Sequence, residues 1–131
     1  MAFNAQQNDV RKFTEGTWVD LYGARWRVAR AGNPRYLEAL ERHGKRHAQS
    51  KADEQRALML AIAEGILLGW EEVVDAKGEP IPYSVDNAAE VLADNPEVVN
   101  ALLAEANRAE NFRREDVKAQ AKKPPTRSRT D

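Results

Sequence analysis

Two histidines, His43 and His47, stand four residues apart in a segment with helical patterning, a spacing at which two imidazoles can share a metal ion. A zinc site normally needs three or four ligands, and the carboxylate close by, Glu41, falls on a different helical face. No HExxH pattern surrounds the pair. We therefore expect no metal site here and interpret the two histidines as a solvated or partly buried pair.

The other acidic residues also lack the arrangement that catalysis or metal binding needs. Glu71 and Glu72 are adjacent, and adjacent residues in an extended strand point to opposite faces, so they cannot act together on one substrate. Asp75 and Gly78 belong to a turn in which the other ligands of a calcium loop are missing. The chain contains no cysteine, no Gly-rich phosphate loop and no recognisable Ser-His-Asp constellation. We expect neither enzymatic activity nor a cofactor.

The run ARWRVAR at residues 24–30 places arginines on either side of a tryptophan. Such a strand could stack on a nucleic acid and neutralise its phosphates. The same alternation is typical of a half-buried strand with Trp26 and Val28 turned inward and the arginines in solvent, and we favour this interpretation. The formal net charge of −1 agrees with it, because a chain with no strong overall field does not concentrate nucleic acid.

Length and composition indicate one soluble domain. The 131 residues are enough for a single core. The N-terminus has no apolar signal segment, and the absence of cysteine fits a reducing compartment. The longest apolar run is broken by Glu64 and is too short to cross a bilayer, which takes about 20 apolar residues. We therefore expect a cytoplasmic location and no membrane association.

That apolar run, residues 57–63, predicts a central core helix, because a helix that is apolar on nearly every face must be covered on several sides. We expect this helix to begin near Ala52 or Asp53, after a cap at Ser50, and to end at Gly69. An extended segment should follow from Trp70, then a turn, and then an extended return through two prolines.

The remaining elements follow from capping and periodicity. A β-hairpin is expected over residues 17–30, with its turn at Gly23, and Trp18 and Trp26 could pair across its strands. Asn33 and Ser84 should each cap a helix, and Asn95 should cap the last one, which we expect to run to about Arg114. The inner face of the helix after Asn33 is predicted to carry Tyr36, Leu37 and Leu40.

The expected fold is a mainly helical α+β domain in which the N-terminal hairpin and a short extended connector pack on a core of about four helices. Residues 1–14 are polar and predict a flexible arm, and residues 15–117 form a single globular domain. Residues 118–131 lack any apolar side chain larger than Ala and contain two consecutive prolines, which predicts a disordered basic tail.

Three segments carry a family resemblance: TWVDLYGARWRVARAGNPRYLEAL, GILLGWEEVVDAKGEPIPYSVDNAAEVLADNPEV and ANRAENFRREDV. Their most specific feature is the order and spacing of Trp70, Asp75, Gly78, Pro82-Tyr83-Ser84 and Asn87. Over residues 16–117 the chain resembles the tail assembly chaperone family of long-tailed bacteriophages. It departs from that family at Glu72, where the family often has Gly, so a backbone kink is less expected at this position.

The resemblance implies a protein that binds the tape measure protein, helps to recruit tail tube subunits during tail morphogenesis and is absent from the mature virion. Its partners would be the tape measure protein and the tail tube protein, with self-association left open. A rival interpretation is a structural virion subunit of the neck or of tail completion, and a weaker one is a nucleic-acid-binding regulator.

The residues suggest one hypothesis for the grip on a partner. An apolar stripe through Leu102, Ala106, Ala109 and Phe112 would present a buried anchor, followed by a cationic segment suited to a helix with acidic flanks. The other interpretation, which we favour, is that Phe112 closes the core and the arginines are solvated. A partner that does not bind this segment would bind the hairpin or the connector from Trp70 to Tyr83. The candidate partner-binding residues are Phe112, Arg113, Arg114, Lys118, Lys122 and Lys123. The candidate structural residues are Trp18, Trp26, Trp70, Gly78 and Tyr83.

Overall fold

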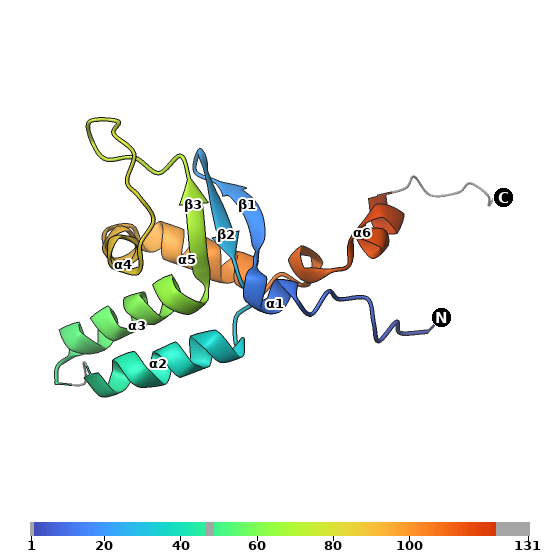
Figure 1. The fold of residues 1–131 in the computed structure, drawn as a ribbon, viewed down its shortest axis with the longest axis horizontal. Helices are drawn as coiled ribbons and strands as arrows, with labels where there is room; N and C mark the ends of the chain where they lie inside the picture. Colours follow the sequence, from blue (N-terminus) through green and yellow to red (C-terminus); the bar gives the residue numbers. More distant parts are fainter. Residues whose placement is uncertain (1, 47–48, 123–131) are drawn as a thin grey trace.

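The computed structural model describes residues 2–46 and 49–122 of the chain (Figure 1). Helices predominate beside one small sheet, so the predicted mainly helical α+β class with an N-terminal hairpin is confirmed. No helix in the described part of the chain combines the length and apolar character needed to cross a membrane. The elements in chain order are α1 (Lys12–Glu15), β1 (Thr17–Leu21), β2 (Ala24–Val28), α2 (Pro34–Arg46), α3 (Lys51–Gly65), β3 (Leu67–Glu71), α4 (Val85–Asp94), α5 (Pro96–Ala106), the 3-10 helix η1 (Ala109–Phe112) and α6 (Glu115–Lys122).

The sheet is antiparallel, with β2 between β1 and β3. Strands β1 and β2 form the expected hairpin, and the two residues of its turn, Tyr22 and Gly23, both have positive φ (54° and 77°). Two positive φ angles are the signature of a type I′ turn, whose twist matches that of the flanking strands. Along β2 buried and more exposed residues alternate, so Trp26 and Val28 face the core as predicted.

Helix α3 ends four residues earlier than expected. Gly69 does not terminate it; the helix ends at Gly65, and residues 67–71 form β3 instead. The backbone N–H of Ala29 donates to the carbonyl of Ile66 (2.8 Å), and β3 then pairs with β2. The free edge of the hairpin therefore offers hydrogen bonds that a longer helix would leave unmade.

The α2–α3 pair lies below the sheet in Figure 1. Asn33 caps α2 as predicted, because its Oδ1 accepts the N–H of Tyr36 (3.1 Å). Leu37 and Leu40 were predicted to lie on the inner face of α2, and this prediction is wrong because both are exposed. Ala39 is fully buried instead. Helix α2 lies very close to the end of α3, since a Cβ added to Gly65 would collide with the backbone of Tyr36.

The core lies between α3, the sheet and the α4–α5 pair. Ser50 caps α3 through the N–H of Asp53 (3.1 Å), as expected. Helix α4 packs on α3, and α5 packs against β2. The largest fully buried side chains come from all of these elements and are Val28, Ile62, Ile66, Leu67, Leu92 and Leu102.

The two end segments lie next to each other, on the right in Figure 1. Asn8 forms an isolated β-bridge with Arg113, and the N–H of Asp9 donates to the carbonyl of Phe112 (2.8 Å). These contacts fall within the segment expected to be a flexible arm. Helix α6 ends at Lys122, so helix extends past residue 118 into the expected disordered tail, and residues 123–131 lie outside the described residues.

Candidate functional site

The most specific part of the family resemblance, the series from Trp70 to Asn87, builds one loop and its two anchors. This loop, residues 72–82, we call the projecting loop (Figure 1). At its base the indole N–H of Trp70 donates to the carbonyl of Ile81 (2.8 Å), and the ring of Trp70 meets that of Tyr83 edge-on at 5.2 Å. The Tyr83 hydroxyl lies 2.6 Å from the carbonyl of Leu67. Burial raises the pKa of Tyr83 to about 12. The base of the loop is thus tied to β3.

The tip of the projecting loop is closed by a turn. Oδ1 of Asp75 accepts the backbone N–H groups of Lys77 and Glu79, both at 2.9 Å, and Gly78 supplies a φ of +82°. Only a residue that tolerates positive φ fits this position at low cost, which explains the glycine. Val74, bridged to Pro80 through the backbone, remains 49% exposed.

The exit from the projecting loop is also capped. Oγ of Ser84 accepts the N–H of Asn87 (3.0 Å), and the Asn87 side chain donates to the carbonyl of Pro82 (2.9 Å). At the entrance, Glu72 has a φ of +68°. A backbone kink was less expected here because the chain has Glu where the family often has Gly. The kink is nevertheless present, because the chain must turn away from β3 at this position. The residues from Trp70 to Asn87 that carry the most specific part of the resemblance thus build the loop and fix its position.

The tryptophans of the hairpin do not pair with each other. The register sets Trp18 opposite Arg27 and Trp26 opposite Val19, so the two indoles lie on opposite faces of the sheet. Trp26 is buried and meets Trp70 of β3 edge-on at 6.1 Å. The expected pairing of Trp18 with Trp26 is wrong because the hairpin register separates the two side chains, and Trp26 pairs with Trp70 of the third strand instead.

The hairpin arginines contact groups within the chain. The guanidinium of Arg25 lies 5.0 Å from the Trp18 ring and 3.1 Å from a carboxylate oxygen of Glu71. Arg27 donates to the carbonyl of Glu15 (2.6 Å). These contacts match the half-buried strand rather than a surface of uncommitted cations that could bind phosphates.

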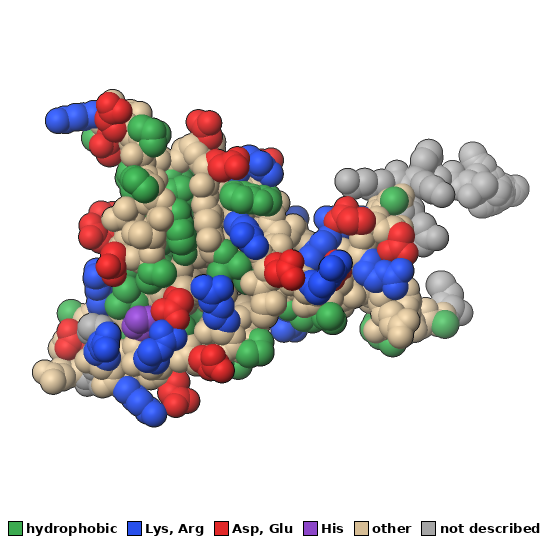
Figure 2. Space-filling model, in the orientation of Figure 1, with side chains coloured by type: hydrophobic (Ala, Val, Ile, Leu, Met, Phe, Trp, Pro, Cys, Tyr) green, Lys and Arg blue, Asp and Glu red, His purple; other side chains and the backbone are tan. Residues whose placement is uncertain are grey.

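A hollow of about 390 Å³ opens between the hairpin turn, the projecting loop and the junction of α4 with α5. We call it the loop groove. Figure 2 shows hydrophobic side chains between the loop, at the upper left, and the strands. Glu72, Asp94 and Glu97 are exposed at its rim. Its apolar lining includes Ala24, Trp26, Val73, Ile81, Val91 and Val98.

From the sequence, the hairpin and the Trp70–Tyr83 connector were predicted only as separate alternative surfaces for a partner, and the groove that they line together with α4 and α5 was not predicted. Its one local signal was the apolar pair Val73-Val74: Val73 packs against the core, whereas Val74 is exposed and has no core to fill. The other walls come from β2 and from the α4–α5 junction, far away in the chain.

The predicted C-terminal grip is arranged differently. Helix α5 ends at Ala106, and Phe112 belongs to η1, so the expected stripe does not continue along a single helix. The ring of Phe112 is 2% exposed and meets Phe13 edge-on at 6.0 Å. The side-chain amide of Asn107 donates to the carbonyl of Leu103, and that of Asn111 donates to the carbonyl of Glu105 (both 2.9 Å). These two hydrogen bonds close the end of α5.

The paired arginines also have contacts within the chain. Arg113 donates to Oδ1 of Asn8 (3.2 Å), and Arg114 forms two hydrogen bonds with the carboxylate of Asp116 (2.6 and 3.1 Å). The hydrogen bond from Arg114 lowers the pKa of Asp116 below its ordinary value. Arg114 also donates to the carbonyl of Gln6 (3.3 Å). The two guanidinium groups thus hold the N-terminal segment against η1 and α6.

The lysines of the predicted site are spread along the end of the chain. Lys118 lies on α6, 3.8 Å from a carboxylate oxygen of Glu115, and Lys122 is the last residue of that helix. Lys123 lies outside the described residues. As for the histidine pair, Nε2 of His43 lies 3.0 Å from a carboxylate oxygen of Glu64, and His47 lies outside the described residues.

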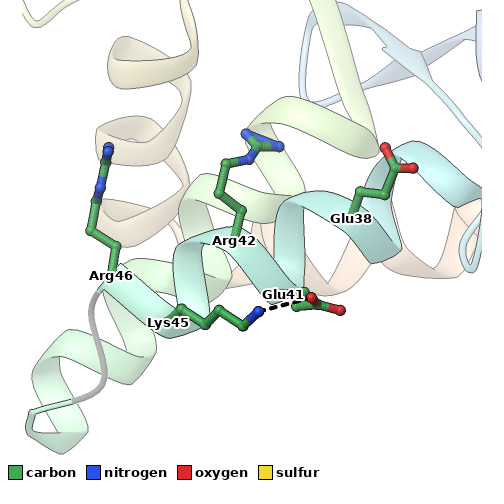
Figure 3. Close-up of a pocket in the computed structure, with 5 residues that line it drawn as sticks. All are labelled: Glu38, Glu41, Arg42, Lys45 and Arg46. Carbon is green, nitrogen blue, oxygen red and sulfur yellow. Dashed lines mark hydrogen bonds and ion pairs between the residues drawn. The ribbon is translucent and has the colours of Figure 1, made fainter.

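A second shallow hollow follows the outer surface of α2 (Figure 3). Lys45 and Glu41 form an ion pair of 3.1 Å along the helix, and Arg42 reaches across to Glu64 of α3 (2.7 Å). The described residues that line it all come from α2 and bear charges of both signs. This surface therefore has the character of a solvated helix face.

Comparison with known proteins places the chain in a phage context. Residues 31–123 match the family described as YdaY prophage protein, a range that begins after β2 and contains the projecting loop. No curated protein and no solved structure matches the chain. The match covers more than half of the 131 residues. The chain therefore belongs to the YdaY prophage protein family and is phage-derived.

Proposed function

We propose that this prophage protein is a tail assembly chaperone. It binds the tape measure protein, helps to recruit tail tube subunits while the tail is built, and is absent from the finished virion. It acts in the host cytoplasm by binding, without catalysis. Phage origin is the established part of this assignment, and the chaperone role is the part proposed here.

One observation carries the proposal. The most specific part of the resemblance to tail assembly chaperones is the series from Trp70 to Asn87, and these residues build one unit, the projecting loop and its two anchors. Together, the residues from Trp70 to Asn87 hold a loop with an exposed valine beside an apolar groove.

The physical need for such a protein is clear. A tape measure protein is long, helical and apolar along one side, so it requires cover until the tail tube encloses it. A small domain with one modest apolar groove can shield the tape measure protein, its client, when many copies bind along it, because linked binding events raise the overall affinity.

Two measurements test the proposal. Co-expression with the tape measure protein of the same prophage should retain that protein on the tagged chain and keep it from aggregating. Mass spectrometry of purified virions should then detect few or no peptides from residues 18–113. Abundant peptides in mature particles would favour the structural virion subunit instead, and failure to retain the tape measure protein would contradict the chaperone role.

A further inference from the structure

We propose that the loop groove is the surface that grips the client, and that it takes an apolar helical segment flanked by lysine or arginine. This inference rests on the proposed function and names the site and the chemistry of the bound segment. It differs from the C-terminal grip, which would select acidic flanks.

The groove offers apolar surface that the fold leaves uncovered. Val74 is 49% exposed on the loop side and Tyr22 is 64% exposed on the hairpin side, so both walls present apolar atoms to solvent. Between them the indole of Trp26 and the side chain of Val98 form a buried floor. An exposed apolar hollow with a polar rim is typical of a protein-binding site, where a few anchors supply most of the binding energy.

The charges at the rim decide which partner fits. Glu72, Asp94 and Glu97 are exposed, and among the residues that the structure describes no lysine or arginine lines the groove. Among the ion pairs between described residues, none involves these three carboxylates. A groove with a rim of one sign attracts the opposite sign and repels its own, so Lys or Arg beside the apolar anchor is favoured.

The walls are held in place before any partner arrives. The Trp70–Ile81 hydrogen bond fixes the base of the loop, and the two bonds to Asp75 fix its tip. Because less ordering is needed on binding, a preformed groove retains more of the free energy of contact.

The C-terminal segment is less suited to this role. Phe112 is buried against Phe13, and Arg113 and Arg114 have hydrogen-bond partners within the chain. Binding there would require these contacts to break first.

The test measures binding of overlapping synthetic peptides that tile the tape measure protein of the same prophage. The groove variant is Asp94→Lys with Glu97→Lys. Its matched control is Glu38→Lys with Glu54→Lys, two exposed glutamates away from the groove, which changes the net charge by the same amount. A second groove variant, Val74→Asp, changes an exposed residue and therefore reports on the groove even if the double variant folds poorly.

We expect the tightest peptides to carry Lys or Arg beside apolar residues. The groove variants should bind them at least about tenfold more weakly, while the control stays within about twofold of the wild type. Added salt should weaken wild-type binding more than binding by the double variant.

Three results would overturn the inference. If the wild type binds peptides and both groove variants bind them equally well, the grip lies elsewhere and the chaperone role stands. If the selected peptides are acidic, the assigned chemistry is wrong. If the wild type self-associates and the Val74→Asp variant does not, the groove is occupied by a second copy of the chain. Absence of binding by the wild type to every peptide and to the co-expressed tape measure protein would contradict the proposed function itself.

Discussion

Asn33 and Asn95 both precede a proline that begins a helix, yet their side chains make different hydrogen bonds. Asn33 accepts from the N–H of Tyr36 and also donates to the carbonyl of Gly65 (2.9 Å), so it ties the start of α2 to the end of α3. Asn95 donates back to the carbonyl of Val91 (2.7 Å) and makes no N-cap bond. Since a single residue separates α4 from α5, its amide closes the first helix instead of opening the second.

Glu72 is strained at its observed φ of +68°, and replacement by glycine should stabilise the protein. A left-handed backbone costs an L-residue roughly 1–2 kcal/mol, part of which the greater freedom of glycine in the unfolded chain offsets. We expect Glu72→Gly to raise the free energy of unfolding by about 0.5–1 kcal/mol in denaturant titration. Glu71→Gly, one residue earlier within β3, should destabilise; a loss of stability in Glu72→Gly would contradict the strain.

Tyr83 should titrate near pH 12 rather than at its ordinary pKa of 10.0, because burial disfavours the phenolate. The folded state then holds a proton that the unfolded state loses above pH 10. The contribution of Tyr83 to stability is therefore complete below pH 10 and disappears as pH rises through about 12. Tyrosinate absorbance of the wild type minus Tyr83→Phe measures the pKa, and a difference curve centred at pH 10 would contradict the burial.

The α2–α3 pair depends on one close approach between helices. A Cβ added to Gly65 would lie 2.3 Å from the Cα of Tyr36, a distance that no real contact allows. The same glycine is the last residue of α3, so the helix ends where the chain must leave α2 and enter the sheet. The end of α3 is thus set by its neighbours rather than by its own helix propensity.

Gly65→Ala should separate α2 from α3 and lower the free energy of unfolding by about 1–3 kcal/mol, the usual cost of overpacking. Gly44, in α2, has no atom within 4 Å of an added Cβ. Gly44→Ala should therefore stabilise by up to about 1 kcal/mol, since alanine favours helix. Thermal melting of both variants tests this prediction. Equal shifts of the melting temperature in the same direction would contradict the close approach of Gly65 to Tyr36.

The two ends of the described chain are coupled although they are more than 100 residues apart. Lys12 donates to the carbonyl of Arg113 (2.9 Å) and pairs with Glu115 on α6. Together with the Phe13–Phe112 contact, this closes the domain on the side away from the projecting loop (Figure 1). The N-terminal segment therefore contributes to stability as well as the helical body.

Removing residues 2–14 should lower the free energy of unfolding by about 2 kcal/mol, because the ring of Phe13 and its partner Phe112 lose their mutual burial. Removing residues 119–131 should leave the melting temperature nearly unchanged, because that stretch has no apolar side chain larger than Ala. A large drop after the second truncation would show that the C-terminal end stabilises the domain.

Local pattern was enough to predict the hairpin, the cap at Asn33, the turn closed by Gly78 and the fold class. Each depends on residues within a few positions of one another, where backbone sterics and side-chain capping dominate. The burial of Trp26 likewise followed from alternation along β2.

Tertiary structure decided the rest. The end of α3, the pairing of Trp26 with Trp70, the exposure of Leu37 and Leu40 and the burial of Phe112 all depend on which distant surface lies opposite. The loop groove is the clearest case, since its walls come from the hairpin, the loop and two helices. Contacts between segments far apart in sequence leave no local periodicity, because their free energy is gained only when the elements have packed.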